Sequence, residues 1–187
     1  IIVGGGIGGL AAAASLRRVG VQPLVLEQAP ELLQVGAGVN LSANGMRALR
    51  YIGADEHVRR TSVLSEGAVF ADLISGQQFS SLPFGSRGEA EWGESFYHVH
   101  RADLLDALLG AVPAQDLRLD SVVIQAEPLG DQVVVTLAGG EEIVGDALIG
   151  ADGLRSVVRT SLFGDHPATP TGYLAWRSLV DADQADA

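Results

Sequence analysis

The sequence predicts an α/β fold that begins with a strand-helix-strand unit and combines a parallel sheet with an antiparallel meander. Residues 1–3 and 21–27 are short apolar runs, and the alanine-rich segment 6–19 between them ends at Gly20. This βαβ unit has the expected length of about thirty residues. Both runs are apolar throughout rather than alternating, which is typical of parallel strands buried on both faces.

Composition and charge limit the classes of partner. Hydrophobic residues make up 47% of the 187 residues and charged residues 19%, which fits one well-buried core and part of a second, and is too apolar for disorder. The formal net charge of −11 would repel nucleic acid and an anionic membrane surface, so we expect neither as a partner. An anionic ligand must therefore be held by local donors.

Cysteine is absent, which excludes disulfides, thiolate metal sites and a cysteine nucleophile, and fits a reducing, cytoplasmic location. The uncharged segment 1–16 contains five glycines and has no basic region before it. It is also shorter than the roughly 20 residues of a membrane span, so we interpret it as strand, turn and helix.

The remaining elements are predicted from periodicity and turn residues. In the first half we expect a glycine-rich loop at 35–41, a helix at Ala43–Ile52 beginning near Ser42, a hairpin of 69–74 and 77–81 around Ser75-Gly76, and an exposed loop at 85–93. In the second half we expect an amphipathic helix at Arg101–Leu109, a meander of 121–126, 132–137 and 147–150, a helix at 157–162 and a last strand at 172–180.

The glycine turn after the first strand predicts a dinucleotide site. Gly4, Gly6 and Gly9 form a G-x-G-x-x-G fingerprint between a strand and a helix, the context in which this motif is specific. Gly4 permits the tight turn, Gly6 lets the backbone approach the pyrophosphate, and Gly9 allows close helix–strand packing. Further backbone amides come from Gly5, Ile7 and Gly8, at the positive end of the helix. The fold is therefore Rossmann-like.

Glu27 ends the second strand, near the position from which a carboxylate binds the ribose hydroxyls. A carboxylate repels a 2′-phosphate, so NADP is not expected at this site. The fingerprint does not separate FAD from NAD, and that choice rests on the rest of the chain.

Four segments in order resemble the single-component, FAD-dependent aromatic hydroxylases. ALIGADGLRSVVR (147–159) carries an Asp-Gly motif at Asp152-Gly153, and VGAGVNLSANGMRALRYIG (35–53) and HVHRADLLDALL (98–109) are similar to family segments. TGYLAWRSLV (171–180) is similar to the branch of salicylate hydroxylase and 3-hydroxybenzoate 6-hydroxylase. The resemblance covers essentially the whole chain and favours FAD.

The resemblance implies a role for each cofactor-binding residue. It assigns the pyrophosphate to residues 4–9, the adenosine ribose to Glu27 beside Gln28, and the adenine to the backbone at Val123. Arg101 would contact the ribityl-phosphate part of FAD. Ala37, Gly38 and Val39 would line the isoalloxazine or ribityl region, and Asp152 would lie beside the pyrophosphate, in a segment linked to both FAD and the nicotinamide nucleotide.

Plainer interpretations stay open for several of these residues. Arg101 could pair with Asp103, Asp106 or Glu94, and Asp152 could cap the following helix. Arg47 is expected to be an exposed helix residue, Trp92 and Trp176 are expected to pack, and Arg177 would enter a substrate-domain strand. His98 and His100 face one side of a strand without a third ligand, so no metal site is predicted.

By this resemblance, the protein is an FAD-dependent monooxygenase that hydroxylates a phenolic acid-like aromatic substrate with O2 and NADH or NADPH. We nominate no catalytic side chain, because the cofactor carries the chemistry. Other flavin-dependent epoxidases, oxidases or reductases, an NAD-dependent dehydrogenase and a catalytically silent FAD-binding module are the alternatives. The meander argues against a plain dehydrogenase domain, which would alternate strands and helices.

The domain prediction places an FAD-binding domain at 1–168 and the beginning of a β-sheet substrate domain at 169–187. The family's later Gly-Asp motif, with its Ala-Ala-His, has no counterpart in the sequence, so we interpret the chain as an N-terminal fragment. Substrate identity, the choice of NADH or NADPH and the oligomeric state, including a homodimer, stay open.

Overall fold

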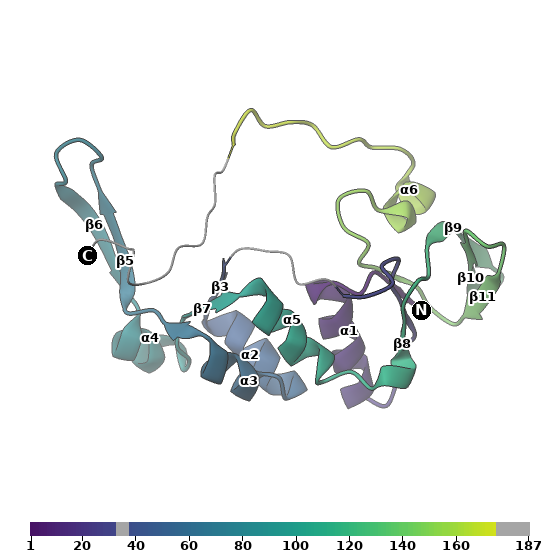
Figure 1. Ribbon diagram of the computed structural model, residues 1–187, viewed down its shortest axis with the longest axis horizontal. Coiled ribbons are helices and arrows are strands. Elements are labelled where there is room, and N and C mark those ends of the chain that lie inside the picture. The colour runs from purple at the N-terminus through teal and green to yellow at the C-terminus, as the bar shows by residue number, and fades with distance from the viewer. Residues whose placement is uncertain (33–37, 175–187) are drawn as a thin grey trace.

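The computed structural model describes residues 1–32 and 38–174, and it opens with the predicted βαβ unit (Figure 1). Strand β1 (Ile2–Val3) leads into helix α1 (Ile7–Arg18) and returns as β2 (Val25–Leu26). The two strands are parallel, with Ile2 opposite Val25 and Val3 opposite Leu26. The prediction of a strand-helix-strand opening is therefore confirmed, although the strands are shorter than the apolar runs.

These strands belong to a four-stranded parallel sheet in the order β12-β1-β2-β8, completed by β8 (Leu117–Arg118) and β12 (Ile149–Gly150). Each face of the sheet is buried in a separate core. Ile2 and Val25 pack with the helices, whereas Val3 and Leu26 pack on the opposite face. Burial on both faces explains why β1 and β2, the two central strands, are apolar at every position.

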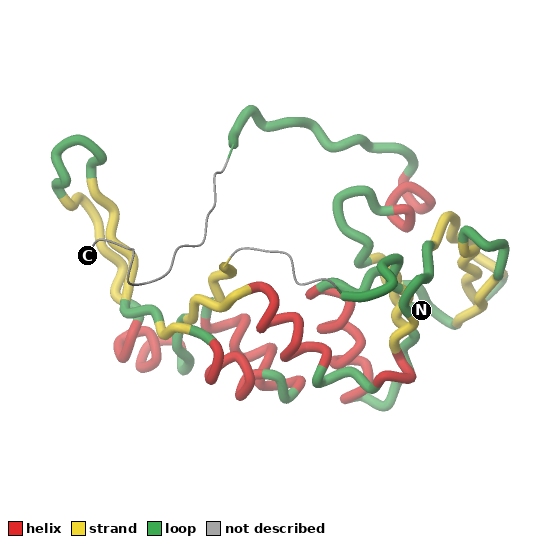
Figure 2. The backbone as a smooth tube through the Cα atoms, in the orientation of Figure 1, coloured by secondary structure: helices red, strands yellow, loops and turns green. Residues whose placement is uncertain are grey.

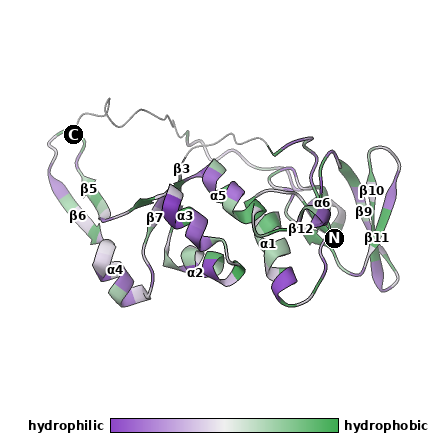
Figure 3. Cartoon of the chain, turned by 60° about the horizontal axis from the view of Figure 1, so that its bottom comes forward, coloured by the Kyte–Doolittle hydropathy of each residue, from purple (hydrophilic) through white to green (hydrophobic). Residues whose placement is uncertain are grey.

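The helical face carries α1, α2 (Ala43–Ile52), α3 (Asp55–Thr61) and α5 (Arg101–Leu109), with the short helix η1 (Ala114–Asp116) leading into β8. Helix α5 buries Leu104, Leu105 and Leu108, and Figure 3 shows hydrophobic residues where it lies near α1. The bounds of both predicted helices, 43–52 and 101–109, are confirmed. None of the helices in the described part of the chain is long and apolar enough to cross a membrane.

The opposite face is covered by the meander and by α6 (Val157–Phe163). The meander consists of β9 (Val123–Leu129), β10 (Gln132–Leu137) and β11 (Glu142–Gly145). The prediction for its third strand was wrong, because residues 149–150 instead form β12 beside β1. The short turn at Gly139-Gly140 brings the residues that follow it back beside β10, where they pair as β11. The later apolar run instead pairs with β1 in the parallel sheet.

A second antiparallel sheet joins β3 (Gly38–Leu41), β7 (Tyr97–His100) and β4 (Val63–Leu64). The predicted hairpin is confirmed with shifted bounds, as β5 (Gly67–Ala71) and β6 (Gln78–Pro83). Figure 2 shows it projecting from the helices at the end opposite the meander. The described part of the predicted last strand, residues 172–174, is not a strand, and residues 175–180 lie outside the described residues.

The predicted loop at 85–93 is instead helix α4 (Gly85–Trp92), so that prediction was wrong. Its polar sequence gave no helical signal, but aromatic packing fixes it at both ends. Phe84 stacks on Phe96 with ring centroids 4.3 Å apart, and Trp92 meets Phe96 edge-on at 5.4 Å. Gly93, at a φ of +70°, ends the helix.

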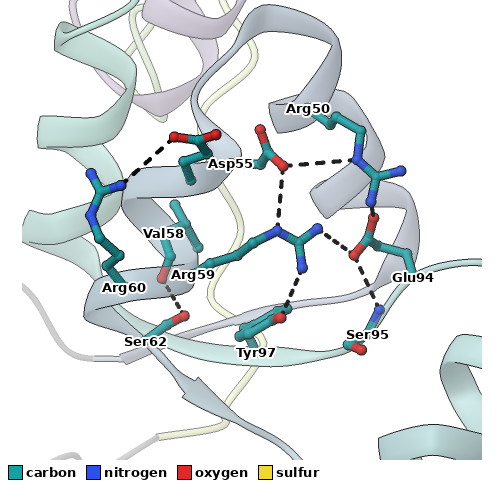
Figure 4. Close-up of polar contacts among 10 residues, drawn as sticks. Arg50, Asp55, Val58, Arg59, Arg60, Ser62, Glu94, Ser95 and Tyr97 are labelled. Atoms are coloured by element: carbon teal, nitrogen blue, oxygen red, sulfur yellow. Dashed lines mark hydrogen bonds and ion pairs between the residues drawn. The ribbon is translucent and has the colours of Figure 1, made fainter.

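A buried carboxylate ties α2 and α3 to the start of β7 (Figure 4). Glu94 is 2% exposed and accepts hydrogen bonds from Arg50 and from Arg59, the latter at 2.5 Å. Arg59 also donates to the Tyr97 hydroxyl at 2.9 Å. Partial burial lowers the pKa of Arg59, but the hydrogen bonds to Glu94 and Asp55 and the charge interactions with Tyr97 and Glu94 together outweigh that effect, so the pKa lies above its ordinary value. Glu94, one of the three acidic residues considered as a partner for Arg101, is thus engaged by Arg50 and Arg59.

Glu94→Ala should lower the free energy of unfolding by about 2–3 kcal/mol, because it leaves two arginines without their buried partner. Arg60→Ala is the matched control, since Arg60 is exposed and lies 3.8 Å from an exposed Glu56. The control should change stability by less than about 0.5 kcal/mol. Urea unfolding of both variants gives the comparison, and equal losses would contradict the assigned role of Glu94.

Candidate cofactor site

The glycine loop follows β1 and depends on two close backbone approaches, one to the segment at Ala151 and one between its own ends. Gly4 has a φ of +105°, and a Cβ there would lie 2.4 Å from the Ala151 carbonyl oxygen. A Cβ at Gly9 would lie 1.8 Å from the Gly4 carbonyl oxygen. At Gly6 and Gly8 a Cβ would meet no atom within 4 Å. Two of the glycines are therefore required by packing, and two leave open space above the loop.

The open space lies at the amino end of α1. Gly6 is the N-cap residue and supplies no side-chain capping bond, and the first turn holds no acidic residue. The amides of a first helical turn have no partner within the helix, and they carry the positive end of the helix dipole. Such an end is suited to an anionic group such as a pyrophosphate.

A cavity of about 450 Å³ extends from this loop. Predicted site residues that line it come from the loop, from the ends of β2 and β12, from the start of α5 and from β9: Gly4, Gly6, Glu27, Gln28, Arg101, Val123 and Asp152. Fold topology thus brings these distant segments to one place. The carboxyl ends of parallel strands meet at this edge of the sheet, where ligands of open α/β sheets bind.

The other predicted residues do not line this cavity. Gly9 is buried under the loop, and Ile7 and Gly8 lie on the first turn of α1. Gly38 and Val39 are in β3, where Gly38 pairs with His100, the residue before Arg101. Ala37, Trp176 and Arg177 lie outside the described residues.

Glu27 makes two hydrogen bonds to backbone. Its carboxylate accepts from the Gly5 amide at 2.6 Å and from the Ala29 amide at 2.9 Å. A Cβ at Gly5 would lie 2.9 Å from the Glu27 Cβ, so this glycine is also required. The sequence analysis missed that requirement. Glu27 therefore holds the shape of the loop as well as offering a carboxylate to the cavity.

Asp152 caps the helix that follows it. Its carboxylate accepts from the Ser156 hydroxyl at 2.6 Å and from the amides of Val157 and Val158 at 2.6 and 3.1 Å. The capping interpretation of Asp152 agrees with these contacts. Gly153, with a φ of +75°, turns the backbone here and also lines the cavity.

The polar or flexible lining residues Ser121, Gly153 and Arg155 are among those that the sequence analysis did not assign to the site. Ser121 follows β8, a two-residue strand that was not predicted. Arg155 follows the Asp-Gly turn, and with Arg101 it gives the cavity two cations in a chain of net charge −11. These two arginines are local donors of the kind that an anionic ligand needs in a chain whose net charge would otherwise repel it.

A family profile described as "FAD binding domain" matches residues 1–179. The chain belongs to this FAD-binding family. The predicted resemblance to FAD-dependent aromatic hydroxylases is confirmed, because similar proteins include enzymes of this kind. Aurachin C monooxygenase/isomerase of Stigmatella aurantiaca is 38% identical over 98% of this chain and 48% of its own length. The 3-hydroxybenzoate 6-hydroxylase of Klebsiella oxytoca is 36% identical over 97% of this chain and 46% of its own.

Solved structures agree on the fold. The 2-methyl-3-hydroxypyridine-5-carboxylic acid oxygenase in its tetrameric form superposes with a TM-score of 0.74 at 31% identity, over 87% of this chain and 41% of that one. Klebsiella pneumoniae HpxO complexed with FAD and uric acid gives 0.75 at 27% identity, over 85% and 40%. The chain spans about half the length of the curated relatives it matches.

Gly9→Ala should destabilise the protein by at least about 1–3 kcal/mol, because the new methyl group collides with the Gly4 carbonyl oxygen. Gly8→Ala is the matched control, since its Cβ points into open space and alanine favours a helix by up to about 1 kcal/mol. Urea unfolding of the two variants should show opposite signs. A Gly9→Ala protein as stable as the wild type would refute the close approach.

Asp152→Ala should lower stability by about 0.5–2 kcal/mol through loss of the α6 cap, whereas Asp152→Ser, which keeps a capping oxygen, should recover part of it. Asp165→Ala, an exposed aspartate beyond α6, serves as the control. Thermal unfolding ranks the three variants. If Asp152→Ala were no less stable than the control, the capping contacts would be energetically unimportant.

Proposed function

We propose that this chain is the FAD-binding part of a monooxygenase that hydroxylates a phenolic acid-like aromatic compound, using NADH or NADPH and O2. The observation that carries the proposal is one cavity that combines an uncapped helix end above a glycine loop, a carboxylate at the second strand and two arginines. Residues 1–168 would form the cofactor domain and residues 169–187 would begin the substrate domain, in a protein that works in the cytoplasm.

The residues of the cavity fit FAD by their chemistry. The open space at Gly6 and the amides of the first turn of α1 suit the pyrophosphate. Glu27, beside Gln28, suits the ribose diol, and the buried Val123 suits the adenine. Arg101 would bind the phosphate next to the ribityl chain, from which the ring would extend along Gly38 and Val39.

When bound, FAD supplies the redox chemistry, in which NAD(P)H provides two electrons, one oxygen atom of O2 enters the aromatic ring and the other becomes water. The protein's own residues bind and orient. Asp152 holds the turn that presents Gly153 and Arg155 to the cavity, and Glu27 holds the glycine loop. No side chain of this chain is assigned a proton transfer.

Another flavin-dependent oxidoreductase of the same superfamily would share this cofactor site. The relatives favour hydroxylation, because several of them are hydroxylases or monooxygenases of aromatic acids. The full-length protein distinguishes the two by NAD(P)H consumption with a panel of phenolic acids. Stimulation coupled to a hydroxylated product supports the monooxygenase, whereas flavin reduction that no aromatic acid stimulates would reject it.

Glu27→Ala should weaken FAD binding by about 1–3 kcal/mol, because a charge-assisted hydrogen bond to the ribose and the hold on the Gly5 amide are both lost. The matched control is Glu31→Ala, an exposed glutamate four residues away. Titration of the apo-protein with FAD, followed by flavin fluorescence, measures both. A wild-type protein that binds NAD but not FAD would refute the flavin assignment.

A further inference from the structure

The β3-β7-β4 sheet carries a hydrogen-bonded chain of polar side chains that the cofactor cavity does not use. His98 Nδ1 lies 2.8 Å from Asn40 Oδ1, and His98 Nε2 lies 3.1 Å from Ser65 Oγ. Asn40 and His98 are directly opposite each other in the β3–β7 register. Ser65, just after β4, is 5% exposed. The neighbouring strands β3 and β7 and the residue that follows β4 thus contribute one side chain each.

These side chains lie on the face of the sheet that is turned away from the core. Val39, Leu41 and Val99 pack into the helical core. Because side chains alternate along a strand, Asn40 and His98 project to the other face, and both are exposed. An exposed histidine that is held at both ring nitrogens is an ordered group rather than a freely rotating one.

The hydrogen bonds fix the chemistry that Asn40 offers. An amide oxygen only accepts, so His98 Nδ1 carries the proton and donates to Asn40 Oδ1. In the neutral ring Nε2 then accepts from the Ser65 hydroxyl. With Oδ1 bound to His98, the amide nitrogen, a donor only, is the atom of the Asn40 side chain that remains to bind a ligand on this face.

The position of Asn40 relative to the cofactor cavity follows from the strand register. In the proposed arrangement of FAD, Glu27 and Val123 lie on the adenosine side of the cavity and Arg101 lies on the ribityl side. Arg101 follows His100, which pairs with Gly38. Asn40 is two residues further along β3 on the same face, which is about 7 Å. In that arrangement the flavin half of the dinucleotide, beyond Arg101, would extend toward the face that carries Asn40.

The start of β7 is also fixed. Tyr97, the neighbour of His98, is hydrogen-bonded to Arg59 of the network around Glu94 (Figure 4). At the other end His100 Nδ1 accepts from the Ala102 amide at 3.3 Å. Because β7 is held at both ends, the Asn40–His98 contact has a defined place in the sheet.

We propose that Asn40, oriented by His98 and Ser65, is a specificity-determining residue whose amide nitrogen donates a hydrogen bond to the ring-hydroxyl oxygen of the aromatic substrate. This inference rests on the proposed function and deepens it, because it names the substrate group that the site reads. Asn40 contacts substrate, and His98 and Ser65 are positioning residues. No proton or electron is transferred in this contact.

The test measures the dissociation constant of 3-hydroxybenzoate for the FAD-loaded, full-length protein, from the perturbation of flavin absorbance. Asn40→Ala should weaken binding by on the order of tenfold to a hundredfold, the loss of one hydrogen bond to an ionised or strongly polar oxygen. The isosteric Asn40→Asp should weaken it further, because a carboxylate oxygen replaces the donor and repels the substrate oxygen. Asn44→Ala, an exposed asparagine at the start of α2, should bind as the wild type does.

Two arms identify the substrate group and the positioning role. Benzoate, which lacks the hydroxyl, should bind the wild type and Asn40→Ala equally, whereas phenol, which lacks the carboxylate, should retain the difference. His98→Ala should weaken 3-hydroxybenzoate binding less than Asn40→Ala, with no added loss in the double variant, and His98→Gln should recover part of it. FAD affinity, measured separately, should not change.

Asn40→Asp binding 3-hydroxybenzoate within twofold of the wild type, with normal FAD uptake, would overturn the inference and leave the proposed function standing. An equal loss with benzoate would also overturn it, since the amide would then read the carboxylate. A wild-type protein that takes up FAD but in which no aromatic acid perturbs the flavin rejects the proposed function and the inference together.

Discussion

Three stretches of backbone meet at the amino end of α1 with no side chain between them. The Gly4 carbonyl oxygen fills the space that a side chain at position 9 would need, and the Ala151 carbonyl oxygen fills that of position 4. This contact allows β12 to pair beside β1, with the Ala151 amide donating to the Val3 carbonyl at 2.8 Å. It therefore places the Asp152 turn against the glycine loop, and the cofactor cavity exists because the two are adjacent.

Around this contact, acidic side chains shape the backbone, while arginines line the cavity. Glu27 and Asp152 each use a carboxylate to hold amides, one in the glycine loop and one at the start of α6. Arg101 and Arg155 enter the cavity from different elements. A strongly acidic chain can therefore form a site suited to a pyrophosphate, because the donors act at short range and the net charge acts only through solvent.

Strand β7 links the cofactor side of the molecule to the second sheet. Its first residue is anchored to Arg59, its last residue precedes Arg101, and His98 between them holds Asn40. The buried Glu94 holds Arg59 and, through it, the start of β7. The positions of Arg101 in the cavity and of Asn40, the proposed substrate contact, both depend on this strand. The hydrogen bonds, rather than the length of this short strand, define its position.

The sequence by itself determined the βαβ opening, the dinucleotide fingerprint, the helices at 43–52 and 101–109 and the family, because each depends on local periodicity or on a motif with fixed spacing. Helix α4, the partner of β12 and the short strand β8 were not predictable from local pattern, since aromatic stacking and long-range pairing decide them. The same holds for Asp152 and Asn40. Their residue types allow several roles, and only the tertiary structure, by bringing the α6 amides and His98 within hydrogen-bonding distance, decided which atoms each side chain has left for a ligand.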